Sequence, residues 1–314
     1  MQLCESTSFR AGGILGVTAM ALAAAWPLCA QQRLVSGKPD FKADSTLVLV
    51  PVTVVDHRGA IVNGLTSNAF TLTENGVRQP ISAFSEEDAP VSIGIVLDLS
   101  GSMKRVLGAA KESLRTLLKD SNPADEAFLN AVSTRPRPYC RFTQDFDGVL
   151  SRIAFEDAEG NTALIDTIYD SFEELRAGVH LRKALLVISD GMDNHSRHTK
   201  QEMLERALES DAQIYTIAVA NWAPNSKAIE LVEARRGVLF LDELAARTGG
   251  LSFIVGDRTD IEKAAASIGQ ALRNQYTIGY VPRDDGRSGQ WRRIRVKVTG
   301  SGLRAYARSG YRLD

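Results

Sequence analysis

The sequence predicts an α/β protein in which a doubly wound, mostly parallel sheet has helices on both faces and a small antiparallel β-domain accompanies it. Between residues 89 and 274, apolar runs of strand length alternate with amphipathic stretches of helical period, a pattern typical of parallel strands joined by crossover helices. Both flanks instead contain short alternating strands separated by turn signals. The length of 314 residues leaves room for one large domain and one smaller one.

The central region begins with the apolar run 91–97, which predicts a fully buried strand, and an amphipathic helix follows over 103–118. Further strands are expected at 127–132, 138–143, 184–189, 214–219 and 251–255, with 138–143 as an edge strand. Further helices are expected near 148–155, after Thr162, across 203–208, at 241–247 and across 261–272. This order of elements favours a doubly wound sheet.

The two flanks carry the signals of antiparallel sheets. Before the central region, strands are expected at 47–55, 70–76 and 81–84, with Asn75-Gly76 as a hairpin turn. After it, strands are expected at 276–281, 291–298 and 303–307, and the alternating charges of 291–298 predict one solvated face. Because isolated hairpins are only marginally stable, we expect both flanks to join in one β-domain into which the central domain is inserted. The predicted division is 1–30, 31–88, 89–275 and 276–314.

A loop rich in oxygen atoms follows the first buried strand. It reads Asp98-Leu99-Ser100-Gly101-Ser102, and ligands of parallel α/β sheets bind beyond the carboxyl ends of the strands. Two other segments offer similar groups, since Thr162 opens a helix and Asp190 ends the buried strand 184–189. Hard divalent cations prefer such oxygen ligands.

Together these residues resemble the metal-ion-dependent adhesion site of the von Willebrand factor type A domain. The resemblance covers about 89–274 and implies that Ser100, Ser102 and Thr162 bind the cation through hydroxyls, while Asp98 and Asp190 bind it directly or through water. It also implies Mg²⁺, with Mn²⁺ or Ca²⁺ as alternatives, and a protein partner whose exposed Asp or Glu completes the coordination. The whole arrangement is similar to secreted von Willebrand factor A-related proteins of acidobacteria.

Each part of the motif also has a purely structural interpretation. Ser102 precedes an amphipathic helix and Thr162 opens another, so either hydroxyl could serve as a helix N-cap. Asp190-Gly191 is a common turn pair. The joint order of the three loops, each next to the element that the fold requires, favours the metal site.

The N-terminal region predicts export. Arg10 precedes an apolar stretch that ends at Trp26, and Pro27-Leu28-Cys29-Ala30 follows, which is the pattern of a secretory signal cleaved after Ala30. The alternative is an uncleaved membrane anchor. The protein is therefore expected outside the cytoplasm, either secreted or periplasmic.

Composition excludes several classes of function. Lys and Arg number 37 against 38 Asp and Glu, a formal net charge of −1, so no basic bias indicates nucleic acid or an anionic membrane. Cleavage would leave Cys140 as the one cysteine of the three, which excludes a disulfide framework within the mature chain. We expect Cys140 to pack as a small apolar residue near a sheet edge.

The enzyme classes considered lack essential groups. A haloacid-dehalogenase-like phosphatase needs a second Asp where Ser100 stands, and no G-x-S-x-G elbow is present for a serine hydrolase. His195 and His198 lie in a polar loop, where they are expected to face solvent, and no zinc spacing involves them.

The sequence therefore predicts a non-enzymatic, metal-dependent, adhesion-type module that binds a protein. The alternative is a structural protein of the cell envelope whose metal stabilises the fold. A metal-dependent hydrolase is the third hypothesis.

Overall fold

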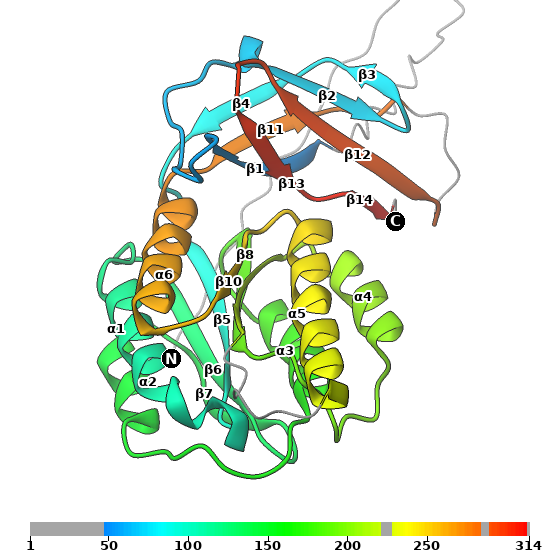
Figure 1. The fold of residues 1–314 in the computed structure, drawn as a ribbon. Coiled ribbons are helices and arrows are strands. Elements are labelled where there is room, and N and C mark those ends of the chain that lie inside the picture. Colours follow the sequence, from blue (N-terminus) through cyan, green and yellow to red (C-terminus); the bar gives the residue numbers. More distant parts are fainter. Residues whose placement is uncertain (1–46, 221–227, 284–288, 313–314) are drawn as a thin grey trace, which may run out of the picture. The chain divides into compact units, whose positions relative to one another are not determined.

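A computed structural model of the chain describes residues 47–220, 228–283 and 289–312. The predicted signal peptide, with Cys29, lies outside these residues. Contacts group residues 45–314 into one compact unit, drawn in Figure 1. Among the described residues, no helix combines the length and the apolar composition that crossing a membrane requires.

A six-stranded sheet forms the centre, with strand order β10-β9-β8-β5-β6-β7. All neighbouring pairs are parallel except β6 and β7, which confirms the predicted fold class. Its strands are β5 (Val91–Asp98), β6 (Glu126–Val132), β7 (Arg137–Thr143), β8 (Arg182–Ser189), β9 (Gln213–Val219) and β10 (Ser252–Val255). The free thiol of Cys140 lies half-buried on the edge strand β7 and packs against the core, as predicted.

Helices cover both faces of this sheet (Figure 1). Apolar side chains of α1, α2 and α6 share one core cluster with the sheet, and those of α3, α4 and α5 share the other. The helices are α1 (Leu107–Lys119), α2 (Phe146–Ile153), α3 (Leu164–Arg176), α4 (Lys200–Glu209), α5 (Ala228–Thr248) and α6 (Arg258–Arg273). A 3-10 helix, Gly101–Arg105, precedes α1.

The prediction for α5 was too short. The expected helix 241–247 is only the last third of α5, which begins at Ala228. Its earlier turns expose Leu231, Val232 and Leu239 and include Gly237, so they lack the continuous apolar stripe by which an amphipathic helix is recognised.

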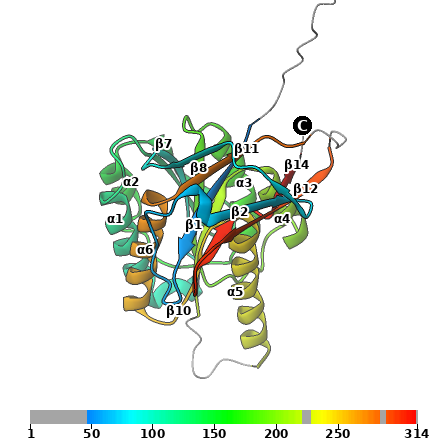
Figure 2. The same ribbon diagram turned by 90° about the horizontal axis from the view of Figure 1, so that it is seen from above.

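The two flanks form a pair of antiparallel four-stranded sheets, β13-β1-β11-β4 and β14-β12-β2-β3. In Figure 2, β1 from the N-terminal flank lies along β11 from the C-terminal flank, and the register pairs Val50 with Ile278. Asn75 and Gly76 have positive φ angles of 49° and 85°, as a type I′ hairpin turn requires. The strands are β1 (Val48–Val55), β2 (Phe70–Glu74), β3 (Val77–Gln79), β4 (Ala83–Glu86), β11 (Tyr276–Tyr280), β12 (Trp291–Val298), β13 (Arg304–Ala307) and β14 (Gly310–Arg312).

A buried polar cluster ties the flanks together inside this β-sandwich. Glu74 of the N-terminal flank accepts a hydrogen bond from the Arg292 guanidinium at 2.9 Å. Its other oxygen accepts the hydroxyls of Tyr280 and Tyr311 at 2.5 and 3.0 Å. Glu74 is 5% exposed and Arg292 is 3% exposed. These buried groups therefore form with one another hydrogen bonds that replace those to water.

Buried polar contacts also join the sandwich to the central sheet. The side-chain amide of Gln275, just before β11, donates to Gln213 of β9 at 2.6 Å. The Arg182 guanidinium of β8 donates to the Gln275 side chain at 3.0 Å and to the Leu272 carbonyl at 2.6 Å. The predicted domain boundaries remain a prediction, since residues 45–314 form one contact unit.

Replacing Glu74 with Ala should strongly destabilise the protein. The change removes the carboxylate of a buried ion pair with Arg292, which costs roughly 3–5 kcal/mol in comparable cases. The free energy of unfolding, measured in urea, provides the test. Thr71→Ala, at a half-exposed position of the same strand, is the matched control and should change stability by less than about 1 kcal/mol. Equal stabilities of the two variants would contradict the assigned role of Glu74.

Candidate metal site

Two acids lie at the carboxyl ends of adjacent parallel strands. Asp98 ends β5, Asp190 directly follows β8, and the register places Leu97 beside Ile188. The strand order reverses direction at β5 and β8, which makes their junction a topological switch point, the usual position of a ligand site in such sheets. Asp98 is fully buried and Asp190 is 8% exposed.

Hydrogen bonds of Asp98 connect the two loops. One oxygen accepts the backbone N–H of Ser100 at 2.8 Å, and the other accepts the Ser189 hydroxyl at 2.5 Å. The Ser189 oxygen in turn accepts the N–H of Gly191 at 3.0 Å. Ser189 was not predicted as part of the site. Its one signal in the sequence is its position as a hydroxyl residue directly before Asp190, at the end of an apolar strand.

The predicted hydroxyl ligands are not used as helix caps. The Ser100 and Ser102 hydroxyl oxygens lie 3.1 Å apart. Helix α1 begins only at Leu107, and Ala163 rather than Thr162 is the N-cap residue of α3. In neither helix does the side chain of the N-cap residue accept a capping hydrogen bond. The capping interpretation is therefore wrong for both Ser102 and Thr162, which leaves their hydroxyls free of that role.

Thr162 is held against the loop that carries Asp190. Its backbone N–H donates to the Asn194 side chain at 2.9 Å, and its carbonyl accepts the backbone N–H groups of Asn194 and His195 at 3.0 and 3.1 Å. The segment before Thr162 also reaches the Asp98 loop, because the Glu159 N–H donates to the Leu99 carbonyl at 2.8 Å. Backbone contacts thus join all three predicted loops.

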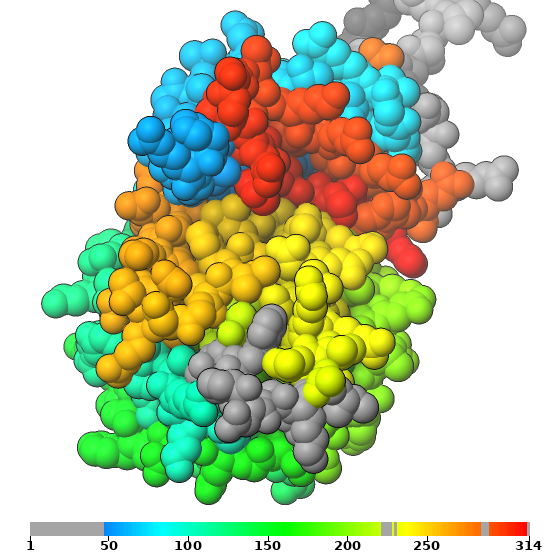
Figure 3. Space-filling view, viewed as in Figure 1, coloured from blue at the N-terminus to red at the C-terminus, as the bar shows by residue number. Residues whose placement is uncertain are grey.

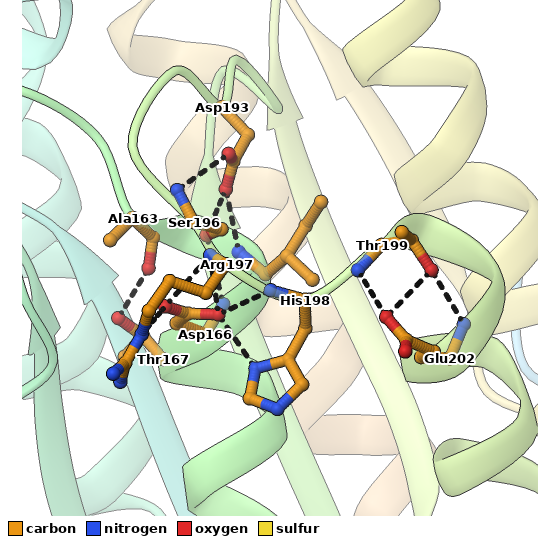
Figure 4. Close-up of polar contacts among 10 residues, drawn as sticks. Ala163, Asp166, Thr167, Asp193, Ser196, Arg197, His198, Thr199 and Glu202 are labelled. Carbon is orange, nitrogen blue, oxygen red and sulfur yellow. Dashed lines mark hydrogen bonds and ion pairs between the residues drawn. The ribbon is translucent and has the colours of Figure 1, made fainter.

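A second set of contacts fixes the far part of the Asp190 loop to the first turn of α3 (Figure 4). Asp193 accepts the backbone N–H of Ile165 at 2.8 Å and the Ser196 hydroxyl at 2.5 Å. The Ser196 oxygen accepts the N–H of Asp166 at 3.0 Å. Side chains of this loop therefore satisfy N–H groups at the start of α3, which the helix itself leaves unpaired.

Asp166 makes the reciprocal contacts. Its carboxylate accepts the backbone N–H groups of Arg197 and His198, each at 3.0 Å, and the His198 ring nitrogen Nδ1 lies 2.7 Å away. Burial raises the pKa of Asp166, but the hydrogen bonds from His198 and Arg197 outweigh it and hold the pKa below its ordinary value.

The expectation that both loop histidines face solvent holds for His195 and is wrong for His198. The His198 side chain is only 33% exposed, and its ring stacks on Tyr169 with centroids 4.0 Å apart. The imidazole packs there because it has both a carboxylate and an aromatic face to contact.

The electrostatics of the site favour a cation. Burial, followed by the charge of Asp190, raises the pKa of Asp98 to about 6, although hydrogen bonds from Ser100 and Ser189 oppose the shift. Within the described part of the chain, neither acid forms an ion pair with Lys, Arg or His, and no three His, Cys, Asp or Glu residues cluster as a metal site. The donor set is two carboxylates and three hydroxyls, a combination suited to a hard divalent cation.

Two glycines bring α5 into contact with the Asp190 loop. A Cβ atom built on Gly237 of α5 would lie 2.2 Å from the Gly191 carbonyl oxygen, and one built on Gly191 would lie 2.4 Å from the Gly237 carbonyl carbon. Gly191 also has a φ of 76°, which favours glycine. The backbone that follows Asp190 is therefore positioned by direct contact with α5.

No protein-family model matches the chain, and none of the curated proteins matches it. Among solved structures, the chain is similar to a von Willebrand factor type A protein from Catenulispora acidiphila, with 13% identity, a TM-score of 0.49, and coverage of 87% of this chain and 74% of that one. An aerotolerance-related membrane protein from Bacteroides fragilis has 17% identity, a TM-score of 0.47, and coverage of 58% and 98%.

The von Willebrand factor domain of a type V pilus tip protein from Porphyromonas gingivalis has 11% identity, a TM-score of 0.45, and coverage of 59% and 95%. Such domains are thus among the structures that the chain is similar to, as the sequence resemblance predicted. With identities below a fifth and TM-scores below 0.5 in all three comparisons, no ligand or partner is transferred from them to this chain.

The stability of the metal-free protein should fall as the pH rises from about 4 to 6. The folded-state pKa of Asp98 lies near 6 against an ordinary 3.8, so the folded protein binds the proton more tightly than the unfolded chain does. Ionisation of the buried Asp98 lowers the free energy of unfolding. This loss is absent below the pKa of Asp98 in the unfolded chain, grows as the pH rises, and is complete above its pKa in the folded protein, where it reaches roughly 3 kcal/mol.

Urea unfolding in EDTA, compared with Asp98→Asn, isolates this effect from other titrating groups. The stability difference between the variant and the wild type should grow in favour of the variant as the pH rises. A difference that does not change between pH 4 and 7 would contradict the burial of a titrating Asp98.

Replacing Gly237 with Ala should weaken the binding of Mn²⁺ or Mg²⁺ by roughly tenfold or more. The added Cβ requires the Asp190 loop or α5 to move, whereas alanine itself is a better helix former than glycine. Gly269→Ala in α6 is the control, because a Cβ there meets nothing within 4 Å. Cation affinity and thermal stability are measured on both variants, and equal affinities would show that the glycine contact does not position the site.

Proposed function

We propose that the chain is an exported, non-enzymatic module that binds a protein partner through a divalent cation. The observation that carries the proposal is the pair of buried carboxylates of Asp98 and Asp190, which among the described residues has no cationic partner. A buried charge without a partner is costly, and a bound cation would remove this cost. Mg²⁺ is the proposed ion, with Mn²⁺ and Ca²⁺ as alternatives, since oxygen ligands suit all three.

The proposed ligands are Asp98, Ser100, Ser102, Thr162 and Asp190. Three of these groups are neutral, so two carboxylates face a doubly charged ion, and water would complete its coordination. An incoming carboxylate could displace that water and bring further negative charge to the ion. The partner is therefore proposed to present an exposed Asp or Glu.

The exposure of one proposed ligand supports access of such a partner. Ser102 is exposed, while Ser100 and Thr162 are 1% and 4% exposed. The donor groups thus extend from the sheet to the surface at the end of β5. Export is proposed from the N-terminal sequence, which lies outside the described residues.

The alternative is a structural protein of the cell envelope in which the ion only stabilises the three loops. The hydrogen bonds that join these loops favour this alternative, because they hold the loops together without any partner. A metal-dependent hydrolase is the third possibility.

Cation binding is tested by calorimetric titration with Mg²⁺ and Mn²⁺. Asp190→Ala should abolish binding and Thr162→Ala should weaken it, because the first change removes a charged ligand and the second removes one hydroxyl. Lys119→Ala, at an exposed position, is the control and should bind as the wild type does. Undiminished binding by Asp190→Ala would contradict the site.

The adhesion and structural hypotheses are separated with the immobilised protein and an envelope extract. The adhesion hypothesis predicts that proteins are captured in Mg²⁺ and released by EDTA. It also predicts that capture is lost when the carboxyl groups of the extract are amidated. A melting temperature that EDTA lowers, with the same proteins captured in both conditions, would support the structural alternative.

A further inference from the structure

The β-sandwich presents a cationic face on its β14-β12-β2-β3 sheet. Outward residues of β12 and β3 include four exposed cations, Arg78, Arg293, Arg295 and Lys297, and Trp291 stands at the start of β12 with 37% exposure. The half-exposed Thr71 and Thr73 of β2 lie between them. We call these four cations and Trp291 the cationic face.

The cations of this face have no ion-pair partner within the described part of the chain. No ion pair involves any of the four cations there. The acid of β2, Glu74, is buried on the opposite side of the sheet and pairs with Arg292. The chain as a whole has a formal net charge of −1, so the concentration of positive charge is local rather than a consequence of composition.

The positions of the cations follow the strand repeat. Every second residue of β12 is one of the cations Arg293, Arg295 and Lys297. Alternate strand residues point to the same face, and their Cα atoms lie about 6.8 Å apart. The register aligns Arg295 with Thr73 and Thr73 with Arg78. The face is therefore a row of cations along one strand, with a fourth cation two strands away.

A hollow lies within this face. It has a volume of about 390 Å³ and is lined by Thr73, Asn75, Gly76, Trp291, Arg293 and Arg295, with no acid among them. A second hollow, of about 620 Å³, shares Trp291, Arg293 and Arg295 with the first, and its lining also includes Glu205 and Glu209 of α4. Figure 3 shows the orange and red surface of these C-terminal strands bordering the yellow surface of α5. An anion would thus be favoured in the first hollow.

We propose that the cationic face binds an extended acidic segment of a partner polypeptide in which every second residue is Asp or Glu. An extended chain repeats its side chains on one face at the same interval as β12 does, so its carboxylates can meet Arg293, Arg295 and Lys297 in succession. Arginine forms bidentate hydrogen bonds with carboxylates, and exposed Trp and Arg are the residue types that dominate protein interfaces. This surface is separate from the metal loops and requires no cation.

The test uses two labelled peptides of identical composition, one with Glu and Thr alternating and one with all Glu residues in a block. Affinities are measured by fluorescence anisotropy in EDTA at about 0.15 M salt, where weak long-range attraction is screened. The wild type should bind the alternating peptide at least about fivefold more tightly than the blocked peptide.

The variant Arg293→Glu/Arg295→Glu should bind the alternating peptide at least about tenfold more weakly than the wild type. The matched control Lys119→Glu/Arg141→Glu reverses two exposed cations elsewhere on the chain and should stay within about twofold of the wild type. Circular dichroism checks that each variant is folded. Because EDTA is present throughout, failure of the metal site would not affect this result.

Three results would overturn the proposal. Equal affinities for the two peptides would show that binding depends only on total charge. An equal loss of affinity for the alternating peptide in the control variant would show the same. Binding to phosphatidylglycerol vesicles that the Arg293→Glu/Arg295→Glu change abolishes, without binding of the alternating peptide, would assign the face to a membrane surface.

Discussion

Two carboxylates, those of Asp98 and Asp190, lie buried beside each other where β5 and β8 end, and within the described residues no cation pairs with them. Like charges that are close together and out of water oppose ionisation, and the raised pKa of Asp98 reflects both causes. Such a pair destabilises the folded protein unless a ligand binds to it. The proposed divalent cation would convert this repulsion into two favourable contacts.

The surrounding contacts keep the three loops in place whether or not the ion is bound. Ser189 links Asp98 to the backbone after Asp190, and Asn194 links that loop to Thr162. Asp166 and Gly237 fix the same loop from two further sides. A rigid set of donors loses little conformational entropy when a ligand binds, so this arrangement fits a site that is formed in advance of its ligand.

Much of the fold was accessible from the sequence because it depends on local pattern. The apolar runs gave the strands of the central sheet, and Asn75-Gly76 gave the hairpin at which both φ angles are positive. The start of α1 was misplaced because Gly101–Arg105 forms a 3-10 helix, whose three residues per turn cannot be told from an α-helical turn over so short a segment. The earlier turns of α5 were missed because several of their apolar side chains, those of Leu231, Val232 and Leu239, are exposed.

The predicted ligands were named from their place after buried strands or, for Thr162, at the start of a helix. The residues that support them were not predicted. Asp166, Asn194 and Gly237 act on segments that lie 28 or more residues away in several of these contacts, and single-sequence patterns do not report such pairs. In the sequence, Gly237 indicates only a residue of low helix propensity; its role becomes clear from its contact with Gly191.

The most direct test of the account is an anomalous difference map from crystals of the protein grown with Mn²⁺, recorded near the manganese absorption edge. We expect one peak among the oxygens of Asp98, Ser100, Ser102, Thr162 and Asp190, with hydroxyl and carboxylate oxygens at metal-ligand distances. A map from Mn²⁺-saturated crystals with no peak there, or with manganese bound only elsewhere on the chain, would contradict the account.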